Sequence, residues 1–83
     1  MKISVRYFAS IREIIGVPGE SRDTKAATLA VLRDELIACG GGYAASLARG
    51  SAVRVALNQV MSDETAALEE GAEVAFFPPV TGG

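Results

Sequence analysis

The chain has 83 residues, of which 49% are hydrophobic, so it has the size of one small domain with a single core, which we place at residues 1–83. Its eight basic and ten acidic residues are spread along the chain and give a net charge of −2, so neither nucleic acid nor a membrane is an expected partner. A single cysteine excludes a disulfide within the chain. The absence of histidine removes the commonest metal ligand and the commonest general base, which argues against a metal site and against a self-contained enzyme.

The first strand is predicted by the alternation of residues 2–8. Ile3, Val5 and Tyr7 share one side and should face the core, which places Phe8 on the opposite side. No apolar run at this end is long enough for a signal peptide or a membrane span. We therefore expect a cytoplasmic protein.

A short helix is predicted next, because Ile11, Ile14 and Ile15 follow helical spacing and Gly16 can end a helix. Residues 20–25 then offer no apolar face. Charged side chains protect an exposed sheet edge against unwanted pairing, so we expect a short edge strand there.

The main helix is predicted over residues 28–39, with Thr28 as its N-cap. Its apolar residues recur on one face, formed by Leu29, Leu32, Leu36, Ile37 and Cys39. Its charged residues are expected to face water: Arg33, Asp34 and Glu35. We interpret Cys39 as a buried structural thiol, since a helix carboxyl end disfavours the thiolate that reactive chemistry requires.

The second half of the chain reads as strands joined by short connections. Residues 43–49 favour a short helical segment, and residues 52–57 alternate as a strand with three residues inward, Val53, Val55 and Leu57. Asn58-Gln59 predicts a turn into a brief strand at Val60-Met61, and Leu68 should pin the following loop to the core.

The last strand begins after Gly71 and should place Val74 and Phe76 in the core. Because successive side chains of a strand point to opposite faces, Phe77 should then lie on the outer face of the sheet. Phe8 has the same outer parity, and Met61 can join them. An exposed apolar patch of this kind predicts a protein-binding surface.

The chain ends in Phe76-Phe77-Pro78-Pro79-Val80-Thr81-Gly82-Gly83. The prolines cannot donate to a sheet ladder, so residues 77–83 should form an extended tail, and the glycine pair leaves the terminal carbonyl sterically open. Six residues from Pro78 span about 20 Å at full extension. The terminal carboxylate is an anion at neutral pH and must be activated before anything is transferred from it.

This ending resembles that of the MoaD family of ubiquitin-like sulfur carriers, the small subunits of molybdopterin synthase. Further segments follow the family's order, namely Val5 to Ala9, Ile11 to Glu13, Ala56 to Gln59 and Gly71 to Ala75. The pattern alone predicts an α+β fold, and the resemblance implies a β-grasp fold, a mixed sheet packed on one main helix. Residues 20–25 depart from the family's pattern of a second strand.

The resemblance implies a sulfur carrier that is not an enzyme on its own and holds no permanent cofactor. Gly83, aided by Gly82, would be adenylated with ATP by an E1-like, MoeB-like enzyme and converted to a thiocarboxylate by a sulfurtransferase. The tail would then enter the large, MoaE-like synthase subunit and give sulfur to a pterin precursor. The implied partner-binding residues are Phe8, Met61, Phe77, Pro78, Pro79, Val80 and Thr81. Arg12 matches a family position near that surface and is equally consistent with a solvated helix residue.

Two alternatives stay open at this point. The first is another ubiquitin-like sulfur carrier, such as one for thiamine, which would share the fold and the Gly-Gly end; the Phe-Phe-Pro-Pro-Val-Thr segment argues against it. The second is a β-grasp interaction module whose tail is never activated.

Overall fold

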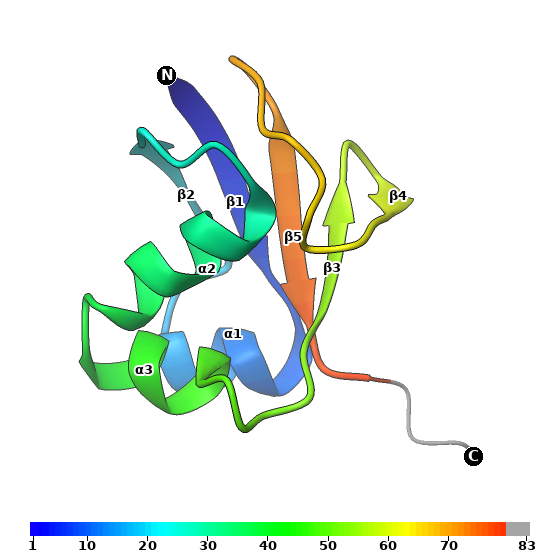
Figure 1. Cartoon of the computed structure of the whole chain (residues 1–83). Helices are drawn as coiled ribbons and strands as arrows, with labels where there is room; N and C mark the ends of the chain where they lie inside the picture. Colours follow the sequence, from blue (N-terminus) through cyan, green and yellow to red (C-terminus); the bar gives the residue numbers. More distant parts are fainter. Residues whose placement is uncertain (80–83) are drawn as a thin grey trace.

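A computed structural model of the chain describes residues 1–79 and shows one mixed sheet with helices on one face (Figure 1). The strand order is β2-β1-β5-β3-β4, in which only β1 and β5 pair in parallel. The strands are β1 (Lys2–Tyr7), β2 (Gly19–Asp23), β3 (Arg54–Leu57), β4 (Val60–Met61) and β5 (Glu73–Phe77). The helices are α1 (Ala9–Ile15), α2 (Leu29–Ile37) and α3 (Gly41–Leu47). The predicted α+β class is confirmed.

The core lies between the sheet and the helices, and strand parity decides which residues enter it. In β1, Ile3, Val5 and Tyr7 are each 1% exposed, and in β5, Val74 and Phe76 are fully buried. These assignments are confirmed. The Tyr7 and Phe76 rings stack with centroids 6.5 Å apart, so the two central strands are packed together as well as hydrogen-bonded.

The predicted edge strand exists as β2, paired only with β1. Its lack of an apolar face is explained by polar contacts with the helical layer. The hydroxyls of Tyr7 and Tyr43 donate to one carboxylate oxygen of Glu20 over 2.8 and 2.5 Å, and Arg22 donates to Glu35 over 2.8 Å. Burial and the bond to Glu20 raise the pKa of Tyr7, while the bonds from Arg22 and Thr24 outweigh burial and lower the pKa of Glu35.

The main helix, α2, is shorter than predicted. The Thr28 hydroxyl accepts from Val31 N over 3.3 Å, which confirms the N-cap, and Leu29, Leu32 and Leu36 are fully buried. The helix ends at Ile37, and the chain then turns so that Cys39 is exposed. The interpretation of Cys39 as a buried thiol is therefore wrong, because helical periodicity does not extend to a residue beyond the helix.

Arg33 was expected in water and is instead 4% exposed. Its guanidinium donates to the carbonyl oxygens of Leu47 and Ala48, each over 2.8 Å, and of Ser51 over 3.1 Å. It also pairs with Glu64 over 2.7 Å. The long side chain can be buried because its donors replace water at the open carbonyls after α3.

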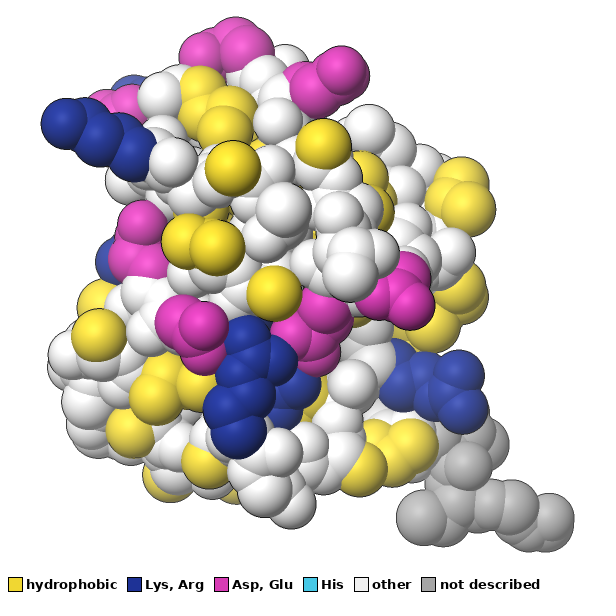
Figure 2. Space-filling model, in the orientation of Figure 1, with side chains coloured by type: hydrophobic (Ala, Val, Ile, Leu, Met, Phe, Trp, Pro, Cys, Tyr) yellow, Lys and Arg dark blue, Asp and Glu magenta, His cyan; other side chains and the backbone are white. Residues whose placement is uncertain are grey.

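A second arginine extends this network at the surface. Arg49 pairs with Asp34 over 2.8 Å and also with Glu64. Basic and acidic side chains accordingly lie side by side on the face of Figure 2 where α2 and the loop of residues 62–70 lie. The bonds from Arg49 and Arg33 outweigh burial and lower the pKa of Glu64. The loop, which Leu68 also pins to the core as predicted, is thus tied to α2 and to the turn after α3.

The remaining elements differ from expectation in detail. Gly16 ends α1 with φ of 96°, as predicted, but Ile14 on that helix is 50% exposed. In β3, Val55 is inward as expected, whereas Ala56, which has outward parity and lies between Met61 and Ala75 in the ladders, is only 7% exposed. Within residues 1–79, no helix combines the length and apolarity needed to cross a membrane.

The predicted turn at Asn58-Gln59 is confirmed and also contacts β5. Both residues adopt left-handed backbone angles, with φ of 50° and 69°, as tight hairpin turns between twisted strands require. The side-chain oxygen of Asn58 accepts from Glu73 N over 2.9 Å, and Asn58 N donates back to Glu73 O over 2.8 Å. The hairpin of β3 and β4 is therefore fixed to the start of β5.

We predict that the two aromatic residues at the end of β5 differ sharply in their effect on stability. Phe76→Ala should lower the free energy of unfolding by about 3–5 kcal/mol, because it empties a fully buried site. Phe77→Ala should lower it by about 1 kcal/mol or less, the scale of one edge-to-face aromatic contact. Urea titrations of both variants measure this, and the reverse order would mean that the strand register is wrong.

We also predict that Arg33 contributes more to stability than Arg49. Arg33→Ala should cost about 3 kcal/mol, because it leaves Glu64 and three carbonyl groups without their buried donor. Arg49→Ala is the control and should cost under about 1 kcal/mol, since its side chain is 46% exposed. Equal unfolding midpoints for the two variants would contradict the network described here.

Candidate functional site

The candidate site lies on the outer face of the sheet, beside the end of β5. Met61 is opposite Ala56 in the β4–β3 ladder, and Ala56 is opposite Ala75 in the β3–β5 ladder, so the three form one row. Phe77 follows two residues after Ala75 on the same face. With Phe8, these residues form what we call the outer-face patch: Phe8, Ala56, Met61, Ala75 and Phe77.

The aromatic part of the patch is in direct contact. The Phe8 and Phe77 rings meet edge to face, with centroids 6.3 Å apart and planes at 86°. Phe8 is 39% exposed and Met61 is 52% exposed. The structure thus brings Phe8, Phe77 and Met61 onto one face, as strand parity predicted, with Met61 connected to the aromatic pair through the two alanines.

The backbone of Phe8 is held from two sides. Its N–H donates to Phe76 O over 3.1 Å, and its carbonyl oxygen accepts from Ile11 N and Arg12 N at the start of α1. Directly after it, Ala9 has a φ of 50°, which is unusual for a residue with a side chain. This left-handed angle turns the chain sharply from β1 into α1. The strained residue, which the sequence does not reveal, therefore helps to set where the Phe8 ring lies.

Arg6 adds a charge that sequence reasoning missed. Its guanidinium carbon lies 5.3 Å from the centre of the Phe8 ring, within range of a cation–π interaction. The signal was present in the sequence, because Arg6 shares the outward parity of Phe8. The patch is therefore apolar at its centre and carries a basic side chain at its margin.

The predicted tail residues are only partly described. Pro78 and Pro79 follow β5 without regular secondary structure and are half-buried. Val80, Thr81, Gly82 and Gly83 lie outside the described residues, so their predicted roles stay predictions.

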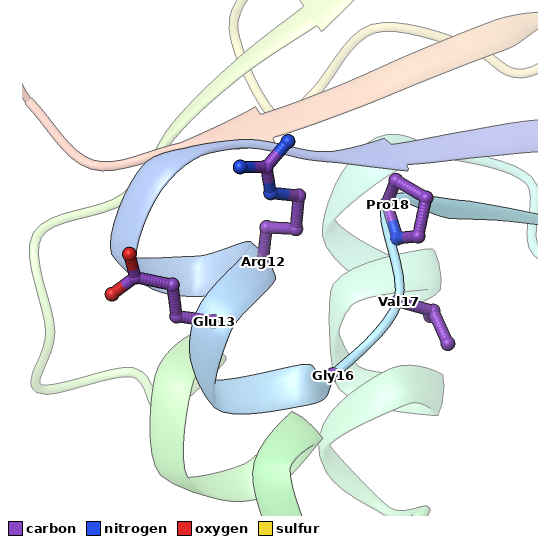
Figure 3. A pocket seen from close by; sticks show the side chains of 5 residues that line it. All are labelled: Arg12, Glu13, Gly16, Val17 and Pro18. Atoms are coloured by element: carbon purple, nitrogen blue, oxygen red, sulfur yellow. The ribbon is translucent and has the colours of Figure 1, made fainter.

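Arg12 lies on α1, outside the outer-face patch. It lines a hollow of about 350 Å³ together with Glu13, Gly16, Val17 and Pro18, where α1 connects to β2 (Figure 3). Arg12 and Glu13 extend from the helix in different directions, and neither faces a second acid or base in this hollow. The hollow therefore offers no acid–base pair for catalysis.

The other chemically reactive groups of the described chain serve structural contacts. Arg22 donates to the Cys39 sulfur over 3.2 Å on the helical side of the sheet, away from the outer-face patch. Among residues 1–79, no group of three histidine, cysteine or carboxylate residues is arranged to hold a metal ion. The geometry therefore supports binding through the outer face and gives the described residues no reaction centre.

Comparison with known proteins identifies the family. A model described as "ThiS family" matches residues 5–83. The chain belongs to the ThiS family. A curated relative from Haemophilus influenzae, named molybdopterin synthase sulfur carrier subunit, is 40% identical over 81 residues, which cover 98% of this chain and 99% of the relative.

Solved structures agree with this family membership. The crystal structure of SAMP1 from Haloferax volcanii has a TM-score of 0.79 and 25% identity, with all of both chains covered. The complex of subunits 1 and 2 of the molybdopterin-converting factor from Helicobacter pylori gives a TM-score of 0.69 and 30% identity, again over all of both chains. The fold is the ubiquitin-like β-grasp of this family, with three helices among residues 1–79.

We predict that Cys39 is dispensable for sulfur transfer. Cys39→Ser should transfer sulfur at the wild-type rate and lower the unfolding free energy by less than about 1 kcal/mol, because the side chain is exposed and lies on the helical side of the sheet. Sulfur transfer and thermal melting should be measured on the same preparations. A folded variant that no longer carries sulfur would overturn the assignment of the carrier group to the chain terminus.

Proposed function

We propose that this chain is the sulfur carrier subunit of molybdopterin synthase and that Gly83 carries the sulfur as a thiocarboxylate. The observation that carries the proposal is similarity over nearly the whole chain to a protein of that name, at 40% identity. The segment Phe-Phe-Pro-Pro-Val-Thr-Gly-Gly supports it, since this sequence leads from the buried Phe76 in β5 to a glycine pair.

The chemistry begins with activation of the terminal carboxylate. The carboxylate oxygen attacks the α-phosphate of ATP in an E1-like partner, which releases pyrophosphate and leaves an acyl-adenylate. Hydrosulfide delivered by a sulfurtransferase then attacks the carbonyl carbon, a C–S bond forms, and AMP leaves with the adenylate oxygen. The resulting thiocarboxylate is a nucleophile whose sulfur can be passed to an electrophilic carbon of a pterin precursor.

The fold supports delivery of this group to a partner. Phe76 is fully buried and fixes the end of β5, so the position from which the tail leaves the domain is held by the core. From Pro78, six residues reach about 20 Å at full extension, enough to enter the active site of a large subunit. The outer-face patch would dock on that subunit, with Pro78, Pro79, Val80 and Thr81 leading into its active site.

Catalytic side chains would belong to the partners. The chain contains no histidine, and its described residues hold no paired nucleophile and base. A partner is consistent with the Helicobacter pylori structure, which is a complex of two subunits. The activating enzyme, the sulfurtransferase and the cytoplasmic location remain predictions from the sequence.

Two other functions are a sulfur carrier for thiamine and an interaction module whose tail is never activated. A carrier for thiamine would share the family and the glycine end, but the curated relative's name favours molybdopterin. An inert interaction module would never be activated. Incubation with ATP, an E1-like enzyme and a sulfur donor, followed by intact-mass measurement, separates carrier from module, because exchange of one oxygen for sulfur changes the mass.

We predict that sulfur loading requires Gly83 as the free terminus. One extra residue turns its carboxylate into an amide and should abolish ATP-dependent thiocarboxylation, with thermal melting unchanged because no described core residue is altered. The control is the same protein after the extra residue has been removed by a carboxypeptidase, which should restore loading. Wild-type loading on Gly83 in the extended chain, verified by mass, would remove the basis of the proposal.

Gly82 provides a graded test of the same step. Gly82→Ala should slow loading and Gly82→Val should nearly stop it, because a side chain next to the reacting carbonyl crowds the attack and a narrow entry channel. Equal rates for all three proteins would show that the size of residue 82 is irrelevant.

A further inference from the structure

Two arginines flank the strand that leads to the tail. Arg6 lies in β1 opposite Ala75 of β5, and Arg54 lies in β3 opposite Phe77 of β5. Both are exposed and have the parity of the outer face. Because β5 runs between β1 and β3, the two cations stand on either side of its last residues and border the outer-face patch.

These arginines differ from three of the four arginines outside the outer face, the exception being Arg12 on α1, which also has no ion pair among residues 1–79. Arg22, Arg33 and Arg49 are held in ion pairs with Glu35, Glu64 and Asp34. Within residues 1–79, neither Arg6 nor Arg54 makes an ion pair, and Arg6 contacts the face of the Phe8 ring. In a chain with a net charge of −2, this end of the sheet is thus locally basic.

The nearest ladder positions on this face do not neutralise the arginines. Gly19 and Ala75 are opposite Arg6, and Phe77 is opposite Arg54, so none of the paired residues is charged. Glu64 lines a hollow with Arg54 but forms its ion pairs with Arg33 and Arg49. The carboxylate of β5, Glu73, is opposite Ser4, one step further toward the other end of the sheet. The patch therefore presents an apolar centre between two cations whose charges no described carboxylate pairs.

We propose that the surface docking on the outer-face patch is an acidic protein surface, with carboxylates placed opposite Arg6 and Arg54 on both sides of an apolar depression for Phe8 and Phe77. The proposal rests on the proposed function and assigns this surface to the large synthase subunit. Charges at the margin of an interface mainly set partner choice and association rate. The aromatic pair at the centre would supply most of the affinity.

Other occupants fit the surface less well. A second copy of this chain would bring the same two cations toward each other across a symmetric contact, which is unfavourable. Nucleic-acid binding relies on neutralising several phosphates and is opposed by the negative net charge. An acidic protein surface with an apolar depression would match both features, because its carboxylates could pair with the two arginines and its depression could bind the aromatic rings.

The test measures association with the large synthase subunit encoded in the same genome. Association rates should be recorded by stopped flow at low and high salt for wild type and for Arg6→Gln/Arg54→Gln. The double variant should associate about 10-fold more slowly at low salt and approach wild type at high salt, because screening removes the steering of exposed charges.

Three further variants separate charge from other causes. Lys2→Gln/Lys25→Gln changes the net charge equally near Met1, at the other end of β1, and should leave the rate within about 2-fold of wild type. Arg6→Lys/Arg54→Lys keeps the charges and should keep the rate. Phe8→Ala should speed dissociation and leave the salt dependence unchanged. Thermal melts confirm that each variant is folded.

The outcomes are distinct. If the arginine-to-glutamine variant matches the distal lysine control while wild type binds and transfers sulfur, the acidic-surface proposal is wrong and the sulfur-carrier function stands. If wild type neither binds the large subunit nor accepts sulfur in the intact-mass assay, the proposed function fails and this proposal fails with it.

Discussion

The structure depends on the parallel pairing of β1 and β5 at the centre of the sheet. The pairing holds the first and last strands of the domain side by side, so the fold is complete only when the end of the chain has joined its beginning. In β5 the pairing also sets the register, with Phe76 in the core and Phe77 on the outer face. A slip of one residue would reverse both faces and remove the patch. One constraint thus serves stability and the docking surface together.

Buried polar groups connect this sheet to a thin layer of helices. A domain of this size has few apolar residues for its periphery, and polar side chains complete the packing there. Glu20 joins the edge strand to Tyr43 of α3, and Arg33 closes the carboxyl end of that same helix. Both clusters lie on the helical side, so the outer face remains open for a partner. The two faces of the sheet therefore have separate tasks.

Much of this arrangement could be predicted from the sequence because the strand period is unambiguous. Alternation in β1 and β5 identified the core and the outer aromatic residues, and Thr28 and Gly16 gave correct helix ends. Charge was a poor guide to burial. Arg33 is buried because it finds carbonyl groups far along the chain, and such partners are invisible in a local pattern. Cys39 was misplaced because the exact end of a helix depends on local turns that periodicity does not detect.

The parallel arrangement of β1 and β5 also has a practical consequence for anyone handling the protein. Parallel strands start at the same end of a sheet, so Met1 lies at the end opposite the exit of the tail (Figure 1). The Met1 ammonium donates to Thr24 O over 3.0 Å, and Thr24 N donates to Met1 O over 2.9 Å. A fusion partner at the amino end would turn the ammonium into a peptide N–H, which can still donate to Thr24 O, and it would leave the second bond unchanged. Affinity tags, surface immobilisation and fluorescent labels therefore belong at the amino terminus, where they leave the outer-face patch and the glycine end accessible.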